Sequence, residues 1–242
     1  MKIHDCVQGT TEWLNLRAGI PTASNFDKIV TPKGAASKQA EKYMFALLAE
    51  RLMGHPIEER GFSHWMDRGS EEEGRAVAFY EFQKDIETVK VGFITNDAGT
   101  VGCSPDRRVG PGLLEIKVPS ESIHVGYLLQ AGSAYEEYRV QVQGQLWIAE
   151  AEWSDVLSWH PELPPAIVRI ERDEPFIAQL DKGVTAFAGV LEEYFEMVVA
   201  RGWVREKPKQ EPARNKLPSL DELVRTAKQA LIDIQKQWEL YT

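Results

Sequence analysis

With 242 residues, 43% of them hydrophobic and 27% charged, the chain is long enough for one substantial α/β domain, and no apolar run approaches the roughly 20 residues that span a bilayer. Only Cys6 and Cys103 are present, which excludes a disulfide framework and a four-cysteine zinc or iron–sulfur site, and residues 1–5 do not begin a signal peptide, so we expect a cytoplasmic protein. The net charge of −9 excludes a surface that coats nucleic acid as a whole, but it leaves room for a local basic groove.

The first part of the chain is predicted to be helical. Residues 11–52 have helical patterning that is broken at residues 19–21, and Thr22 is a plausible N-cap of the short helix that follows. Because a helix N-terminus attracts anions, Ser24 together with Arg17 is a candidate phosphate site. A capping serine and a solvated arginine are the alternative interpretation.

A second helix, predicted over residues 67–80, carries an acid on its packing face. The helical period places Glu73 on that face, whereas Glu71 and Glu72 point elsewhere. An acid that packs inward needs a partner, and a metal ion or its water shell would serve. The alternative is an acidic first turn that complements the helix dipole, which accounts for Glu71 and Glu72 better than for Glu73.

Three strands are predicted next, over residues 86–94, 101–106 and 113–118. Alternation along the last strand places Glu115 and Lys117 on one face and Ile116 on the other.

The turn at Gly110-Pro111-Gly112 is expected to bring Asp106 opposite Glu115. Two carboxylates that meet at one point are hard ligands for a magnesium-like ion, and Lys117 beside them can orient or deprotonate a water molecule. A Glu-x-Lys arises by chance about once in a chain of this length. Here it follows a Ser-Pro-Asp turn, and Glu73 is a candidate third acid, so we interpret the combination as the metal site of a nuclease.

The second half of the domain supplies helices and two more strands. A helix begins near residues 119–122, and another contains Tyr138 and Gln141 one turn apart on a face that would border a site, unless both are merely exposed polar residues. Strands are predicted over 153–159 and 166–170. A long helix then runs from 173 to about 200.

The chain is predicted to divide into a nuclease domain over 1–204, a linker over 205–218 and an amphipathic helix over 219–242. The last helix has a capping box at its start and a stripe made of Leu223, Ala227, Leu231, Ile234 and Trp238. We expect this stripe to pack on its own domain, on another subunit or on a partner protein.

Several segments within residues 11–200 resemble the lambda-exonuclease-like family of phage recombination nucleases, also called YqaJ-type viral recombinases, within the wider PD-(D/E)XK nucleases. These segments are Trp13-x-x-Leu16-Arg17-x-Gly19, Thr22-Ala23-Ser24, Leu47-Leu48-Ala49-Glu50, Cys103-Ser104-Pro105-Asp106, Glu115-x-Lys117-x-Pro119, Gln141-Val142-Gln143 and Ile170-Glu171-Arg172-Asp173-Glu174. Each is weak alone, and together they are specific.

The resemblance implies a metal site with named ligands. Asp106 and Glu115, with the carbonyl of Ile116, would bind Mg²⁺, and Glu73 would support a second ion, with Mn²⁺ able to substitute. Lys117 would position or activate the attacking water. Gln141 and Tyr138 would line the site.

The resemblance also implies a DNA-end site. Arg17, Ser24 and Ser104 match the family's pocket for the terminal 5′-phosphate, which favours a functional role for them. Met66 would be a wedge that parts the terminal base pairs, with a plain packing methionine as the alternative.

The chain departs from the family at one pocket position. Where the family has a further arginine after the Glu-x-Lys strand, this chain aligns Ile123, with His124 beside it. The pocket that the resemblance implies would therefore have one cation fewer than the family's.

The expected fold is α/β, with a central mixed sheet flanked by helices, as in the restriction-endonuclease-like nuclease core. The implied activity is processive 5′-to-3′ digestion of double-stranded DNA ends that carry a 5′-phosphate, leaving 3′ overhangs for annealing. The family implies a homotrimer that threads DNA, whose basic residues need only line the channel. It also implies a single-strand annealing protein as partner, no membrane, and a phage or prophage origin in a bacterial host.

Two other functions are open at this point. The first is another PD-(D/E)XK nuclease, such as a Cas4-like or restriction-type endonuclease, although Cas4-like proteins normally add a cysteine cluster. The second is a non-catalytic DNA-binding scaffold, which would keep the fold but need no metal.

Overall fold

The computed structural model describes residues 1–57, 64–130 and 133–203, without the side chains of residues 64–71 and 133–134. These residues fall within one compact unit, Met1–Arg205. The predicted linker over 205–218 and tail helix over 219–242 lie outside the described residues, as does the Met66 side chain.

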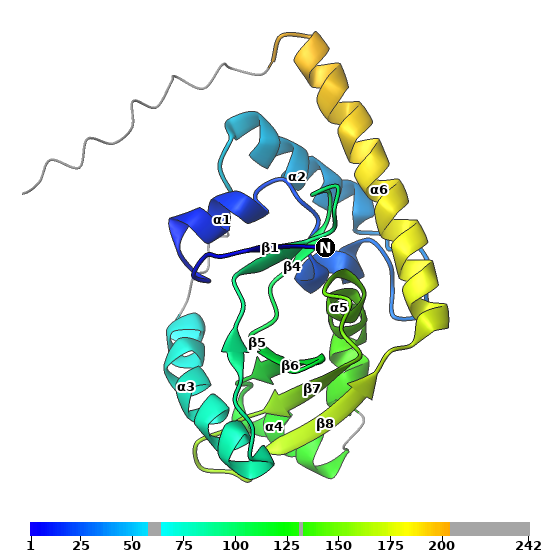
Figure 1. Cartoon of the computed structure of the whole chain (residues 1–242). Helices are drawn as coiled ribbons and strands as arrows, with labels where there is room; N and C mark the ends of the chain where they lie inside the picture. The colour runs from blue at the N-terminus through cyan, green and yellow to red at the C-terminus, as the bar shows by residue number, and fades with distance from the viewer. Residues whose placement is uncertain (58–63, 131–132, 204–242) are drawn as a thin grey trace, which may run out of the picture. The chain divides into compact units, whose positions relative to one another are not determined.

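A five-stranded mixed sheet of order β2-β5-β6-β7-β8 confirms the predicted central sheet (Figure 1). Its strands are β2 (Val89–Lys90), β5 (Arg107–Val109), β6 (Gly112–Lys117), β7 (Trp153–Ser158) and β8 (Ala166–Glu171). The central pair β6 and β7 is parallel, because helices connect these strands, and the other pairs are antiparallel.

A smaller antiparallel sheet of order β1-β3-β4 was not predicted. It contains β1 (Lys2–His4), β3 (Phe93–Thr95) and β4 (Gly102–Cys103). The prediction of one strand over 86–94 is wrong, because β2 and β3 belong to different sheets and the chain crosses between them at Val91-Gly92. A Cβ at Gly92 would lie 2.3 Å from the carbonyl oxygen of Cys6, so the approach of the N-terminal segment requires glycine there.

The chain crosses back to the larger sheet at Ser104-Pro105-Asp106. The prediction of one strand over 101–106 is therefore also wrong, since β4 ends at Cys103 and β5 begins at Arg107. Pro105 has no N–H to donate to a ladder, which favours a break at this point. This second crossing carries two of the predicted site residues, Ser104 and Asp106.

Each helix predicted within the described residues is present. The helices are α1 (Thr11–Arg17), the 3₁₀ helix η1 (Ala23–Lys28), α2 (Ala40–Met53), α3 (His64–Lys84), α4 (Glu121–Leu129), α5 (Ser133–Ile148) and α6 (Glu174–Ala200). Thr22 precedes η1 as predicted, but its side chain makes no capping hydrogen bond. None of the described helices is long and apolar enough to span a membrane.

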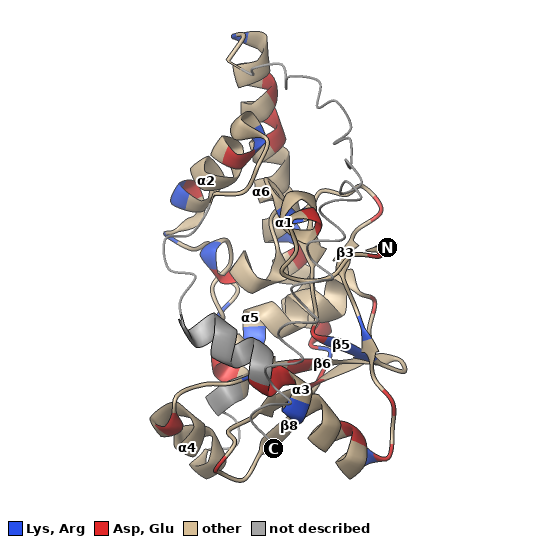
Figure 2. Ribbon diagram, turned by 90° about the vertical axis from the view of Figure 1, so that its left-hand side faces the viewer, with Lys and Arg blue, Asp and Glu red and all other residues tan. Residues whose placement is uncertain are grey.

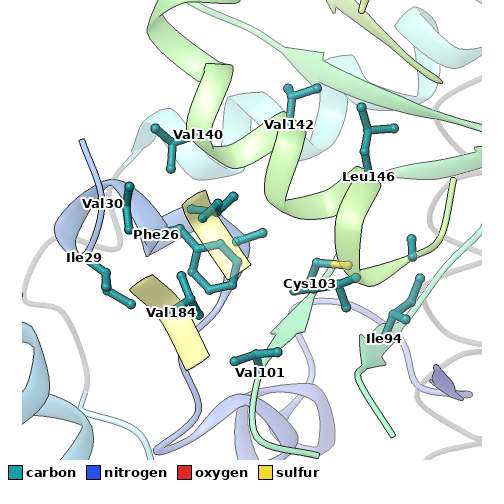
Figure 3. Packing of buried hydrophobic residues seen from close by; sticks show 14 of the residues in the cluster. Phe26, Ile29, Val30, Ile94, Val101, Cys103, Val140, Val142, Leu146 and Val184 are labelled. Atoms are coloured by element: carbon teal, nitrogen blue, oxygen red, sulfur yellow. The ribbon is translucent and has the colours of Figure 1, made fainter. Parts of the chain in front are cut away.

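Alternation along β6 divides the core between the two faces of the sheet. Leu113 packs in the larger cluster with η1, α5 and α6, and Figure 3 shows Phe26 of η1 amid these side chains, beside Val184. Leu114 and Ile116 point to the other face, where a smaller cluster contains Ala76, Val77 and Tyr80 of α3. Burying one such side chain contributes about 1.5–3 kcal/mol, so packing from both sides fixes the register of β6.

Candidate active site

The pairing of β5 with β6 places Asp106 beside Glu115. Arg107 pairs with Leu114, so one step further along the ladder sets Asp106 opposite Glu115 across the turn at residues 110–111, as predicted. The N–H of Ile116 donates to Asp106 Oδ2 at 2.6 Å. A backbone bond from the strand that carries Glu115 therefore fixes the Asp106 carboxylate.

Glu115 is 4% exposed, and its carboxylate accepts three hydrogen bonds. Oε1 accepts from Lys117 Nζ at 2.7 Å and from Gln141 Nε2 at 2.6 Å, and Oε2 accepts from Gln145 Nε2 at 2.7 Å. The Lys117 contact shows that both side chains share one strand face, as alternation predicts. Gln145 was not predicted as a site residue, although it lies four residues after Gln141 and therefore on the same face of the helix.

Lys117 is held by three groups on two elements. Besides Glu115, its ammonium lies 3.3 Å from Gln141 Oε1 and 4.3 Å from the centre of the Tyr138 ring. Burial lowers the pKa of Lys117, but the Glu115 carboxylate outweighs that effect, so the pKa is raised overall. The side chain is therefore a positively charged donor. Tyr138 and Gln141 line the site from α5, where the sequence placed them.

The carboxyl group of Asp106 lies near two other acidic side chains. Burial raises the pKa of the Asp106 carboxyl well above its ordinary range, and repulsion from Glu115 raises it further, with a smaller contribution from Glu73. In Figure 2, the colour of Lys and Arg on β5 lies beside the colour of Asp and Glu on β6. A cation placed between these carboxylates would relieve their repulsion.

Glu73 has a protein partner that the sequence did not reveal. Its Oε1 lies 3.2 Å from a guanidinium nitrogen of Arg107, a side chain that is only 8% exposed. The expectation that Glu72 points away from the sheet is wrong, because Trp159 Nε1 donates to Glu72 Oε2 at 2.9 Å. Glu72 is 13% exposed and Glu73 is 35% exposed, so Glu72 is the more buried of the two acids.

The donor set suits a hard cation that keeps part of its water shell. Within the described residues, no three acidic, histidine or cysteine side chains gather closely enough to hold a metal ion. Glu73 is paired with Arg107, so its support of a second ion stays a prediction. Asp106 and Glu115 remain as two adjacent carboxylates, and Mg²⁺ typically binds one or two carboxylates and completes its shell with water and substrate phosphates.

A second cluster of polar side chains, distinct from the carboxylates of Asp106 and Glu115, contains Arg17, Ser24 and Ser104. The Arg17 guanidinium donates to Ser104 Oγ at 3.3 Å, to Ser24 Oγ at 3.4 Å and to Thr22 Oγ1 at 3.5 Å. It also stacks 4.2 Å from the Trp13 ring centre, and Trp13 Nε1 donates to Ser104 Oγ at 2.9 Å. The alternative of a solvated arginine is therefore wrong.

Arg17 and Ser24 line a cavity of about 470 Å³, together with Trp13, Thr22, Asn25, Lys28 and Tyr43. Burial lowers the pKa of Arg17, but a guanidinium stays protonated in proteins. Among the described residues, no carboxylate forms an ion pair with it. A cation whose partners are hydroxyl groups and an aromatic ring is available to an anion, and a terminal phosphate matches that chemistry.

The departure at 123–124 does not supply a substitute for the family's pocket arginine. Ile123 is 46% exposed, whereas His124 is completely buried. The His124 ring is held between Ser158 Oγ, 2.7 Å from Nδ1, and the carbonyl oxygen of Pro164, 2.9 Å from Nε2. Both ring nitrogens are occupied by internal partners, so His124 is a structural residue.

Comparison with known proteins identifies relatives for most of the described chain. The pattern of the YqaJ-like viral recombinase domain matches residues 12–152. The crystal structure of an alkaline exonuclease, LHK-Exo, from Laribacter hongkongensis is 31% identical with a TM-score of 0.71, covering 80% of this chain and 98% of that one. Its complex with dAMP is 32% identical with the same TM-score and the same coverage of both chains.

A phage-related exonuclease from Haemophilus somnus 129PT is similar in fold, with a TM-score of 0.60 at 14% identity over 76% of this chain and 96% of that one. No curated protein matches the chain in sequence.

Proposed function

The chain belongs to the YqaJ-like viral recombinase domain family, and we propose that it is a DNA nuclease that works as an exonuclease. The observation that carries the proposal is the adjacency of Asp106, which directly precedes β5, to Glu115 and Lys117 on the paired strand β6. Among relatives, the alkaline exonuclease LHK-Exo supports the proposal, because it is 31% identical to this chain and the match covers 98% of the LHK-Exo chain.

The proposed cofactor is Mg²⁺, with Mn²⁺ as a substitute. Asp106 and Glu115, with the Ile116 carbonyl, would hold it, and Glu73 would support a second ion. When bound, such ions stabilise the charge on the attacking and leaving oxygens of a phosphodiester. Burial and repulsion from Glu115 together raise the pKa of Asp106, and this supports the assignment because a divalent cation would relieve the repulsion.

The chain's own residues then divide the remaining work. Gln141 and Gln145 orient the Glu115 carboxylate from α5, and both donors are 2.7 Å or less from its oxygens. The Lys117 ammonium, fixed by Glu115 and by the Tyr138 ring, is placed to orient an attacking water through its N–H donors. The raised pKa of Lys117 favours orientation over proton removal for this side chain.

The proposed direction is 5′ to 3′ on double-stranded DNA. Arg17, Ser24 and Ser104 would hold the terminal 5′-phosphate, and Ser104 lies two residues before Asp106 in the same crossing segment. A relative that has been crystallised with dAMP supports a site for a nucleotide with a phosphate. Digestion of the strand that carries the held end would leave a 3′ overhang for recombination by annealing.

The remaining family features belong to the same proposal. They are processive action by a homotrimer around the DNA, a single-strand annealing protein as partner, a wedge role for Met66, and a phage or prophage protein in the cytoplasm of a bacterial host.

The deciding experiment is digestion of a linear duplex labelled at one 5′ or one 3′ end, with Mg²⁺ and then with EDTA. We expect Mg²⁺-dependent release from the 5′ end, faster for a 5′-phosphate than for a 5′-hydroxyl. Cutting of a closed circle would support an endonuclease instead, and EDTA-insensitive binding without digestion would support a scaffold.

A further inference from the structure

Gln8 lies at the place where both crossings between the two sheets meet. Its side-chain amide donates to the carbonyl oxygen of Val91 at 2.8 Å and to that of Pro105 at 3.0 Å. Val91 belongs to the first crossing, between β2 and β3, and Pro105 to the second, between β4 and β5. One amide group therefore ties together the two crossings, both of which are far from Gln8 in the sequence.

Both carbonyl groups belong to buried residues at breaks between strands. Buried backbone oxygens need a hydrogen-bond donor, and at a break that donor has to come from outside the regular ladder. The N-terminal segment is already packed against the first crossing, because Gly92 is in close contact with the Cys6 backbone. Gln8 follows directly and extends that contact to the second crossing.

The turn that holds Gln8 is itself fixed to α1. Thr10 Oγ1 donates to the Val7 carbonyl oxygen at 2.7 Å, and the same hydroxyl caps α1 by accepting from the N–H of Trp13. Helix α1 carries Arg17, whose guanidinium reaches Ser104. Gln8 is therefore connected on one side to α1, which carries Arg17, and on the other side to the Ser104-Pro105-Asp106 crossing.

We propose that Gln8 is a positioning residue: through Pro105 it fixes the crossing that presents the Ser104 hydroxyl to the Arg17 guanidinium and the Asp106 carboxylate to the strand that carries Glu115. The inference rests on the proposed function, since Asp106 matters there as a metal ligand. Side-chain partners of metal ligands typically change metal affinity by about 10–100-fold, and we expect about tenfold because Gln8 acts through the backbone.

The test compares Gln8→Glu with the wild-type chain. The substitution keeps the shape of the side chain but replaces both N–H donors with an oxygen that repels the two carbonyl groups. Gln83→Glu is the matched control, because Gln83 is exposed on α3 and its side chain makes no hydrogen bond to either crossing among the described residues. Gln8→Ala is the second variant if Gln8→Glu does not fold.

The first readout is amide hydrogen exchange, which needs neither metal nor DNA. The Ile116 N–H is bonded to Asp106, so displacement of Asp106 should raise its exchange rate about tenfold while the amides of β7, a strand paired on both sides, stay as in the wild type. Equal exchange at Ile116 in the variant and the wild type would overturn the proposal. So would an equal increase throughout β7, which would indicate a role in overall stability only.

The second readout is calorimetric titration with MnCl₂. We expect the Kd for Mn²⁺ to rise about tenfold in Gln8→Glu and to be unchanged in Gln83→Glu. An unchanged Kd in Gln8→Glu would also contradict the proposal. If the wild type itself neither binds Mn²⁺ nor digests DNA, the proposed function fails, whereas the exchange rate at Ile116 still decides whether Gln8 positions Asp106.

Discussion

Replacing Gln145 with leucine separates the chemistry of the site from its stability. Gln145 is 1% exposed and donates to Glu115 Oε2, while its own Oε1 is buried and has no hydrogen-bond partner among the described atoms. Loss of a bond to a charged group costs about 1.5–3 kcal/mol, and removal of a buried unpaired oxygen returns about 1–3 kcal/mol. We therefore expect the free energy of unfolding to change by no more than about 2 kcal/mol in Gln145→Leu.

The Mg²⁺ dependence of catalysis should change much more than the stability does. Without Gln145, Oε2 of Glu115 loses its only described donor, so the carboxylate can tilt about the two hydrogen bonds that still hold Oε1. The Mg²⁺ concentration for half-maximal digestion should rise about 10–100-fold, as is typical for partners of metal ligands. The assays are a Mg²⁺ titration of duplex digestion and urea unfolding of the same preparation.

Gln143→Leu is the matched control on the same helix. Gln143 is completely buried, donates to the Glu171 carbonyl oxygen at 2.9 Å and accepts from the N–H of Asp173 at 2.9 Å. It should lose more stability than Gln145→Leu and keep the wild-type Mg²⁺ dependence. A normal Mg²⁺ dependence in Gln145→Leu, with a large loss of stability, would refute the reasoning about Glu115.

Four further outcomes are expected. Lys117→Ala should slow cleavage by about 10²–10⁴-fold while DNA binding in a gel-shift assay is kept, and near-normal turnover would contradict its role. Arg17→Ala should abolish the rate difference between 5′-phosphate and 5′-hydroxyl ends, and a persisting difference would remove Arg17 from the pocket. Tyr80→Phe should destabilise the fold by about 1.5–3 kcal/mol in urea, because the hydroxyl donates to the buried Asp155 at 2.7 Å. Deletion of residues 206–242 should leave the cleavage rate of the folded protein intact, and a folded but inactive product would show otherwise.

Much of the candidate metal site was predictable because it depends on local rules. Strand alternation alone sets Glu115 and Lys117 on one face, and a short turn between antiparallel strands sets Asp106 opposite Glu115. Helical spacing likewise placed Tyr138 and Gln141 on a common face. These relations involve residues close in sequence, where geometry leaves few choices.

The contacts that the sequence did not reveal are long-range. Arg107 neutralises Glu73 from a neighbouring strand, and Gln8 reaches two crossings far along the chain. The first crossing was missed because residues on both sides of Gly92 have strand-forming composition, and only the packing of the N-terminal segment against Gly92 marks the break. The second crossing had a local signal in the Ser104-Pro105-Asp106 turn, but that signal alone does not show that the chain changes sheets there.

The most direct test of the account is calorimetric titration of the wild type, Asp106→Asn and Glu115→Gln with MnCl₂, followed by duplex digestion with the same samples. The account predicts that the wild type binds Mn²⁺ and digests DNA, and that each substitution weakens binding and abolishes digestion while the fold is kept. Undiminished binding and digestion in both variants would show that these two carboxylates do not form the metal site.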